Sequence, residues 1–168
     1  MKLAIMSDSH DNIWNLEKAL AMISGIKADL IVHCGDFVAP FMLKVLEKAG
    51  VPVYGVLGNN DGSGFLLAKT AFSELERITL FELTGHLELD GFSLAFTHQR
   101  IVAEGLAATG RYDLVCYGHS HVYRLETVGK TLLLNPGEIM GKEGRPGFCT
   151  VDTLTREVLR HEIFGGNH

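Results

Sequence analysis

Residues 2–12 read KLAIMSDSHDN, and this stretch sets the pattern that decides the fold. Its apolar run at residues 3–6 predicts a short buried strand, and two metal-type donors follow at once, Asp8 and His10. Asp11 and Asn12 can then cap a helix, which we expect Gly25 to end. The opening therefore reads as a strand, a polar loop and a helix.

The same unit recurs further along the chain. Residues 30–32 and 51–57 are apolar runs that predict a second and a third strand. Between them, Pro40 suits the first turn of a helix that finishes near Gly50. This alternation of strands and helices predicts a parallel sheet with right-handed crossovers.

The rest of the chain predicts more strand than helix. Helices are expected at residues 64–75 and 103–109, and strands at 78–83, 85–89, 92–96, 114–117, 122–128, 131–134, 147–152 and 157–161. Asp90 and Gly91 form a hairpin turn signal. No repeat or linker interrupts the pattern, so we expect a single domain over residues 1–168.

Composition limits the classes of protein that this chain can be. Its net charge of -5 and its lack of a basic run argue against stable nucleic-acid binding. No apolar stretch is long enough to span a bilayer, and the start lacks the pattern of a secretory signal. Cys34, Cys116 and Cys149 lie in apolar segments and read as buried free thiols, so we expect a cytoplasmic protein.

Metal-type donors follow five of the predicted strands. They are Asp8 with His10, Asp36, Asn59, His98, and His119 with His121. Ligand sites in open α/β sheets lie beyond the carboxyl ends of the strands, so these side chains should converge on one rim. A pair of divalent cations takes this mixture of oxygen and imidazole donors, with one carboxylate bridging both ions.

Spacing within the donor segments suggests how they approach an ion. In extended backbone, residues two apart point to the same side, so Asp8 with His10 and His119 with His121 could each approach one ion together. The glycines that precede Asp36, Asn59 and His119 would let the chain leave each strand sharply. Two ions about 4 Å apart could hold a bridging hydroxide and stabilise an in-line displacement at phosphorus.

These motifs occur in a familiar order. The series is Asp8-x-His10, Gly35-Asp36, Gly58-Asn59-x-Asp61, His98 and Gly118-His119-x-His121. It resembles the calcineurin-like metallophosphoesterase superfamily over about residues 2–152. The short length and the turn at Asn135-Pro136-Gly137 resemble its small prokaryotic phosphodiesterase branch, which is related to the retromer scaffold subunit.

The resemblance implies an α/β fold, a four-layer αββα sandwich of two mixed β-sheets flanked by helices. It also implies the ligands of two divalent metal ions: Asp8, His10 and His121 for the first, Asp36 as the bridge, and Asn59, His98 and His119 for the second. Asp61 is expected to support these ligands. Manganese is our first choice of metal, with nickel, iron, cobalt and zinc as alternatives.

The chain departs from the family pattern at several positions. Asn60 replaces a histidine that many catalytic relatives carry, and an amide cannot donate a proton as a general acid. Arg100 either contacts a phosphate or is a solvated surface residue. Asn60, Asp61 and Arg100 are our candidates for catalytic helpers. Glu138 and Arg145 receive no role, and His33, His86, His161 and His168 read as structural or solvated.

The favoured function is a metal-dependent phosphodiesterase that uses a metal-bridging hydroxide on a small phosphate ester. Because Asn60 cannot protonate a poor leaving group, a diester is favoured over a monoester. The alternatives are a phosphomonoesterase acting on nucleotide or protein phosphates, and a non-catalytic interaction scaffold of the same fold. Apolar segments at residues 65–67 and 92–96 could contribute to a homo-oligomer interface if they are exposed.

Overall fold

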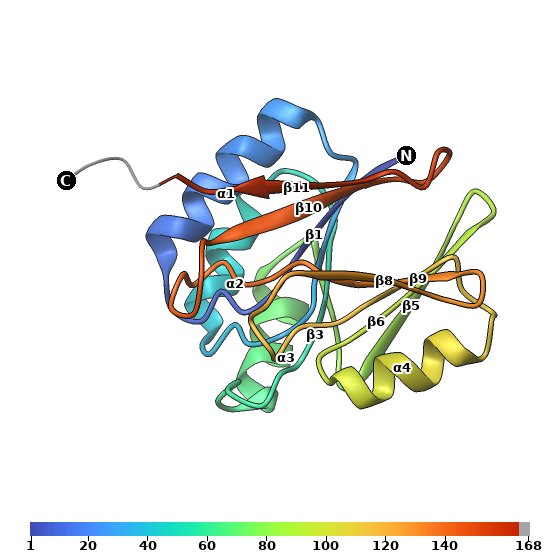
Figure 1. The fold of residues 1–168 in the computed structure, drawn as a ribbon. Coiled ribbons are helices and arrows are strands. Elements are labelled where there is room, and N and C mark those ends of the chain that lie inside the picture. The colour runs from blue at the N-terminus through green and yellow to red at the C-terminus, as the bar shows by residue number, and fades with distance from the viewer. Residues whose placement is uncertain (165–168) are drawn as a thin grey trace.

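The computed structural model describes residues 1–164 of the chain, and within them two β-sheets lie between layers of helix (Figure 1). The six-stranded sheet contains, in spatial order, β11 (Val158–Glu162), β10 (Gly147–Asp152), β1 (Lys2–Met6), β2 (Leu30–His33), β3 (Val53–Val56) and β4 (Ile78–Phe81). The five-stranded sheet contains β5 (Thr84–Leu89), β6 (Phe92–Thr97), β7 (Leu114–Cys116), β9 (Thr131–Asn135) and β8 (Arg124–Val128). The helices are α1 (Ile13–Ile26), α2 (Pro40–Glu47), α3 (Gly64–Glu74) and α4 (Arg100–Ala108).

Both sheets are mixed, as the four-layer prediction requires. Strands β1 to β4 run parallel, while β10 and β11 add an antiparallel edge. In the second sheet β6, β7 and β9 are parallel, and β5 and β8 pair antiparallel at the two edges. The parallel strands of both sheets therefore carry their polar loops at their carboxyl ends.

Three apolar cores hold the four layers together. One core lies between the first sheet and α1, α2 and α3, a second between the two sheets, and a third between the second sheet and α4. Strand β1 contributes to two of them, because Ala4 and Met6 face the helices while Leu3 and Ile5 face the other sheet. Burial on both faces explains why this strand is apolar from Leu3 to Met6.

Two helix boundaries differ from the sequence prediction. Helix α1 begins at the expected cap, where the Asn12 side chain accepts a hydrogen bond from the Asn15 N–H, but Gly25 does not end it. The helix continues to Ile26, and Lys27 ends it in the left-handed conformation, because packing along the helix outweighs the cost of about 1 kcal/mol for an internal glycine. Helix α4 begins at Arg100, three residues before the expected 103.

The two apolar segments considered for an oligomer interface differ in burial. Phe65 and Leu66 are exposed on α3. Phe92, Leu94 and Phe96 lie in β6 and are buried in the core between the sheets, so the second segment cannot form an interface. The three cysteines are buried and free, as predicted. Within residues 1–164, no helix is long and apolar enough to cross a membrane.

A buried histidine joins the ends of β1 and β2. The Gly35 N–H donates to His33 Nδ1 at 3.2 Å, so the ring hydrogen lies on Nε2 and is donated to Ser9 Oγ at 3.0 Å. The ring also stacks on Phe37, with centroids 4.1 Å apart. Burial lowers the pKa of His33 to about 3, with smaller contributions from nearby charges, so the ring is neutral in the folded protein. Of the two readings expected for His33, structural or solvated, its complete burial supports the structural one.

We expect His33 to make the protein sensitive to acid. The unfolded histidine takes up a proton near its ordinary pKa of about 6.5 and the folded one does not, so unfolding becomes easier as the pH falls from there toward 3. The loss from His33 alone should reach about 2 kcal/mol by about pH 5. Urea unfolding of wild type and His33→Gln at about pH 7 and about pH 5 should show a smaller pH effect in the variant. Equal pH effects in both, with the exposed His86→Gln as control, would contradict this role.

Candidate metal centre

The polar loops of both sheets meet at one edge of the sandwich. Loops after β1, β2 and β3 bring Asp8, His10, Asp36 and Asn59, while loops after β6 and β7 bring His98, His119 and His121. The predicted convergence of these segments is confirmed by their contacts. They form two adjoining donor groups that share Asp36.

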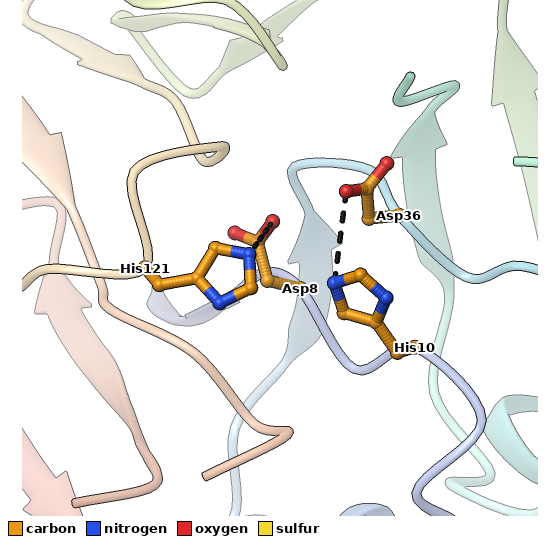
Figure 2. Close-up of side chains that lie close together, drawn as sticks. All are labelled: Asp8, His10, Asp36 and His121. Carbon is orange, nitrogen blue, oxygen red and sulfur yellow. Dashed lines mark ion pairs between the residues drawn. The ribbon is translucent and has the colours of Figure 1, made fainter. Parts of the chain in front are cut away.

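The first donor group consists of Asp8, His10, Asp36 and His121 (Figure 2). One ligand atom from each lies within 4.8 Å of the others. His10 Nε2 is 3.7 Å from Asp36 Oδ2, and His121 Nε2 is 3.4 Å from Asp8 Oδ1. His10 Nε2 is buried and has no hydrogen-bond partner among residues 1–164. A buried, unpaired imidazole nitrogen beside two carboxylates fits a divalent cation.

The second donor group consists of Asp36, Asn59, His98 and His119. Asn59 Oδ1 lies 2.9 Å from His98 Nε2 and 2.7 Å from His119 Nδ1. His98 Nε2 is also 3.5 Å from Asp36 Oδ1. The other ring nitrogen, His98 Nδ1, is 2.8 Å from the Cys34 carbonyl oxygen and donates to it, which directs Nε2 toward the site. The two Asp36 oxygens thus face different groups.

The backbone at these donors is not extended. Asp8, His10, Asp36, His119 and His121 have φ angles of 52°, 45°, 61°, 67° and 62°. The expectation that extended backbone pairs His119 with His121 was therefore wrong, and the two side chains diverge into different donor groups. Positive φ outside glycine is uncommon and costs free energy, although Asp and His adopt it more readily than most residues.

Close approach explains all three glycines that precede donors, since a Cβ on Gly35 would also lie 2.7 Å from His98 Nδ1. Gly35 makes the expected turn with a φ of 99°. A Cβ on Gly58 would collide with the Asp36 carboxylate, and a Cβ on Gly118 would collide with Ser7 Oγ and lie 2.7 Å from Asp8 Oδ2. These glycines let one donor loop press against another.

Asp61 and Asn60 hold Asp36 and its loop in place. Asp61 accepts hydrogen bonds from the Val38 N–H at 2.6 Å and the Gly58 N–H at 2.7 Å. Asn60 donates its backbone N–H to Asp36 Oδ1 and its side-chain amide to Asp36 Oδ2, both at 2.8 Å. Burial raises the pKa of Asp61, and the two N–H groups oppose this rise. The loops of β2 and β3 are therefore joined through carboxylates.

Arg100 forms ion pairs with two glutamates. Its Nε donates to Glu104 at 2.7 Å and its Nη2 lies 3.5 Å from Glu126. The hydrogen bond to Glu104 raises the pKa of this exposed guanidinium. A role for Arg100 in catalysis stays a prediction. These contacts favour the alternative that Arg100 is a solvated surface residue.

Three other histidines were predicted to lie outside the site. His86 stacks on Tyr112, with Nδ1 2.9 Å from the tyrosine hydroxyl, and His161 contacts Thr150. Neither contacts a donor among residues 1–164. His168 lies outside the described residues.

Glu138 is the residue of the site that the sequence analysis missed. It is 1% exposed, and its Oε2 accepts a hydrogen bond from His121 Nδ1 at 2.7 Å. Its Oε1 accepts from the Glu143 and Gly144 N–H groups at 2.6 and 2.8 Å. Burial raises the pKa of Glu138, but these donors and His121 together lower it, so the carboxylate is ionised. It fixes the proton of His121 on Nδ1 and leaves Nε2 free beside Asp8.

A signal for Glu138 was present in the sequence. It follows the carboxyl end of β9, a parallel strand of the second sheet, as the other donors follow their strands.

Burial raises the pKa of Asp8 as well as that of Glu138, and in Asp8 this rise is opposed by Ser7 and the nearby histidines. The rim therefore gathers several buried carboxylates, which a bound cation would neutralise.

Comparison with known proteins agrees with this geometry. Residues 1–156 match the model of the calcineurin-like phosphoesterase superfamily domain. Phosphodiesterase MJ0936 of Methanocaldococcus jannaschii is 34% identical over 160 residues, which cover 94% of this chain and 96% of that protein. The solved structure of a novel archaeal phosphodiesterase has a TM-score of 0.86 at 33% identity, covering 96% of this chain and 99% of that one.

A more distant neighbour shares the fold alone. Vps29 of Entamoeba histolytica, solved with zinc, has a TM-score of 0.68 at 14% identity and covers 98% of this chain and 100% of its own. The predicted likeness to the retromer subunit is confirmed at the level of the fold.

Removing the Asp61 carboxylate should weaken the donor loops. Asp61→Ala leaves the Val38 and Gly58 N–H groups without their acceptor, which should lower the free energy of unfolding by about 2 kcal/mol. Asp61→Asn keeps one acceptor oxygen and should lose about half as much. Urea denaturation of the three proteins checks this order, and equal stability of Asp61→Ala and wild type would contradict it.

Glu138→Gln should weaken metal binding without unfolding the protein. The amide cannot accept from His121 and from both backbone N–H groups at once, so His121 loses its fixed orientation. Isothermal titration of Mn²⁺ should show an affinity about 10- to 100-fold lower for one site. Glu143→Gln, a change of an exposed side chain on the same loop, is the matched control and should bind as wild type does. Unchanged affinity in Glu138→Gln would refute the role.

Proposed function

Because this chain belongs to the calcineurin-like phosphoesterase superfamily, we propose that it is a phosphodiesterase whose two donor groups bind two divalent cations. Its relative from M. jannaschii bears the name of a phosphodiesterase and covers nearly the whole chain. Manganese is our first choice of metal, with iron, cobalt, nickel and zinc as alternatives that suit the same imidazole and carboxylate donors.

The observation that carries this proposal is the position of the Asp36 carboxylate. One oxygen faces His10 in the first donor group and the other faces His98 in the second, at 3.7 and 3.5 Å. A carboxylate with one oxygen toward each of two neighbouring donor sets is suited to bridge two ions. Two hydrogen bonds from Asn60 keep it in that orientation.

Cations bound there would polarise the phosphoryl oxygens and activate water for in-line attack. The chain itself supplies the positioning. Glu138 holds His121, the Cys34 carbonyl oxygen holds His98, and Asp61 holds the loop of Asp36. Side chains fixed in this way keep the charged groups where the transition state needs them.

Asn60 supports a diester as the substrate. Its amide is engaged with Asp36 and has no acidic proton, so it cannot protonate a leaving group. A diester with a good leaving group needs little such help, whereas a monoester with a poor one needs more. Phosphomonoesterase activity on nucleotide or protein phosphates is therefore the second candidate.

A non-catalytic scaffold is the third candidate, suggested by the Vps29 neighbour. The donors argue against it, because the seven residues named by the family motifs lie within two compact groups in this chain. A scaffold has no need of so many buried carboxylates and imidazoles at one rim.

Activity after metal removal tests the proposal. Stripped protein should not hydrolyse bis(p-nitrophenyl) phosphate, and Mn²⁺ should restore hydrolysis with a higher kcat/KM than for p-nitrophenyl phosphate. His98→Ala and Asp36→Asn should each lower kcat/KM by about 10²- to 10³-fold in a folded protein, while His86→Ala should not. No turnover of either ester with any of the five metals would favour the scaffold. A higher kcat/KM for the monoester would favour the second candidate.

A further inference from the structure

A pocket of about 330 Å³ opens beside the candidate metal centre. It lies between the loop after β7, the loop between β9 and β10, and strand β11. Its lining includes His121, Tyr123, Glu143, Arg145, Arg160 and Glu162. Because His121 also belongs to the first donor group, the pocket adjoins the place where a phosphoryl group would bind.

Arg160 is the unusual residue of this pocket. Its guanidinium carbon lies 4.9 Å from the centre of the Tyr123 ring, and its Nη2 donates to the Arg145 carbonyl oxygen at 3.0 Å. Its Nε is buried and has no hydrogen-bond partner in residues 1–164, and no carboxylate of that part of the chain lies within 4.0 Å of it. Partly buried cations are normally paired, so this one has charge to offer a ligand.

The two carboxylates of the pocket each pair with a cation other than Arg160. Glu162 pairs with Arg145 at 3.0 Å, and Glu143 pairs with Lys142 at 3.5 Å. Within residues 1–164, Arg160 therefore has no carboxylate partner, in a chain whose net charge is -5. Stacking on Tyr123 fixes the guanidinium before any ligand arrives, which lowers the entropic cost of binding.

Arg160 also stands close to the backbone of the donor loop. A Cβ placed on Gly137 would lie 3.7 Å from both Arg160 Nη2 and the His121 carbonyl oxygen. The guanidinium is thus next to the chain that carries His121, and within residues 1–164 it forms no hydrogen bond or ion pair with a donor side chain. This position suits a group of the substrate other than the phosphate under attack.

We propose that this pocket binds one ester arm of the substrate, an arm bearing a second anionic group such as a phosphate or a carboxylate, through Arg160. The inference rests on the phosphodiesterase function proposed above. A guanidinium presents a planar pair of N–H donors that matches the oxygens of either anion. The enzyme would then prefer diesters with a charged arm over diesters with neutral arms.

Three substrates test this preference. They are the p-nitrophenyl 5′-phosphodiester of thymidine with a free 3′-hydroxyl, with a 3′-phosphate and with a 3′-hemisuccinate. All release nitrophenolate, so only the arm differs. For wild type we expect KM for at least one charged ester to be about 10-fold or more below that of the neutral ester, the size of a hydrogen bond to a charged group. The charged ester that gains identifies the anion.

Arg160→Met should remove this preference. It keeps the length and packing of the stem, so KM for the charged ester should rise about 10-fold while kcat and the neutral ester change less than about two-fold. Arg160→Lys keeps the charge and should retain part of the preference. Arg111→Met, a change of an exposed arginine, should behave as wild type does. Thermal unfolding checks that each variant is folded.

Binding supplies a readout apart from turnover. Equilibrium titration of thymidine 3′-phosphate and thymidine 3′-hemisuccinate should show weaker binding to Arg160→Met than to wild type. Equal KM for all three esters in wild type, or equal losses for neutral and charged esters in Arg160→Met, would overturn the inference. If wild type hydrolyses no ester, the function proposed above fails, and the titrations alone then decide the pocket: tighter binding to wild type supports it and equal binding overturns it.

Discussion

The structure depends on bringing one buried carboxylate, Asp36, between imidazoles that come from both sheets. It is buried, receives two hydrogen bonds from Asn60, and faces His10 and His98. Charged groups in such a place are costly unless other groups compensate them. The layers, the glycines and the supporting carboxylates can all be understood as the means of holding this arrangement. The three apolar cores between the layers stabilise the fold and offset the free-energy cost of burying these charged groups.

Much of the fold and the donor set could be predicted because both leave local signals. The burial of β1 on two faces is visible in the sequence as an unbroken apolar run from Leu3 to Met6. Pro40 likewise marks the first turn of α2. Donors such as Asp8 and Asn59 stand just beyond strands, where the topology of an open sheet brings loops together. The order of the motifs then supplied the pairing of donors, which single residues could not.

What the sequence could not supply depends on tertiary contact. The positive φ of His119 is set by its position in a tight loop. The two-residue spacing of His119 and His121 in the sequence suggests extended backbone instead. Glu138 shows its role only when β9 lies beside β7 and the carboxylate reaches His121. That Arg160 has no carboxylate partner in the described part of the chain becomes clear only once the partners of Glu162 and Glu143 are known.

The origin of the donors in two different sheets has a mechanical consequence. Asp8 comes from the first sheet, yet it accepts the backbone N–H of His119 from the second at 3.1 Å, and its oxygens also face His121. Any ion held by both sides would oppose separation of the two sheets, with a stabilisation that grows with the logarithm of its free concentration over its dissociation constant. The concentration of free metal would then contribute to the stability of the fold as well as to its chemistry.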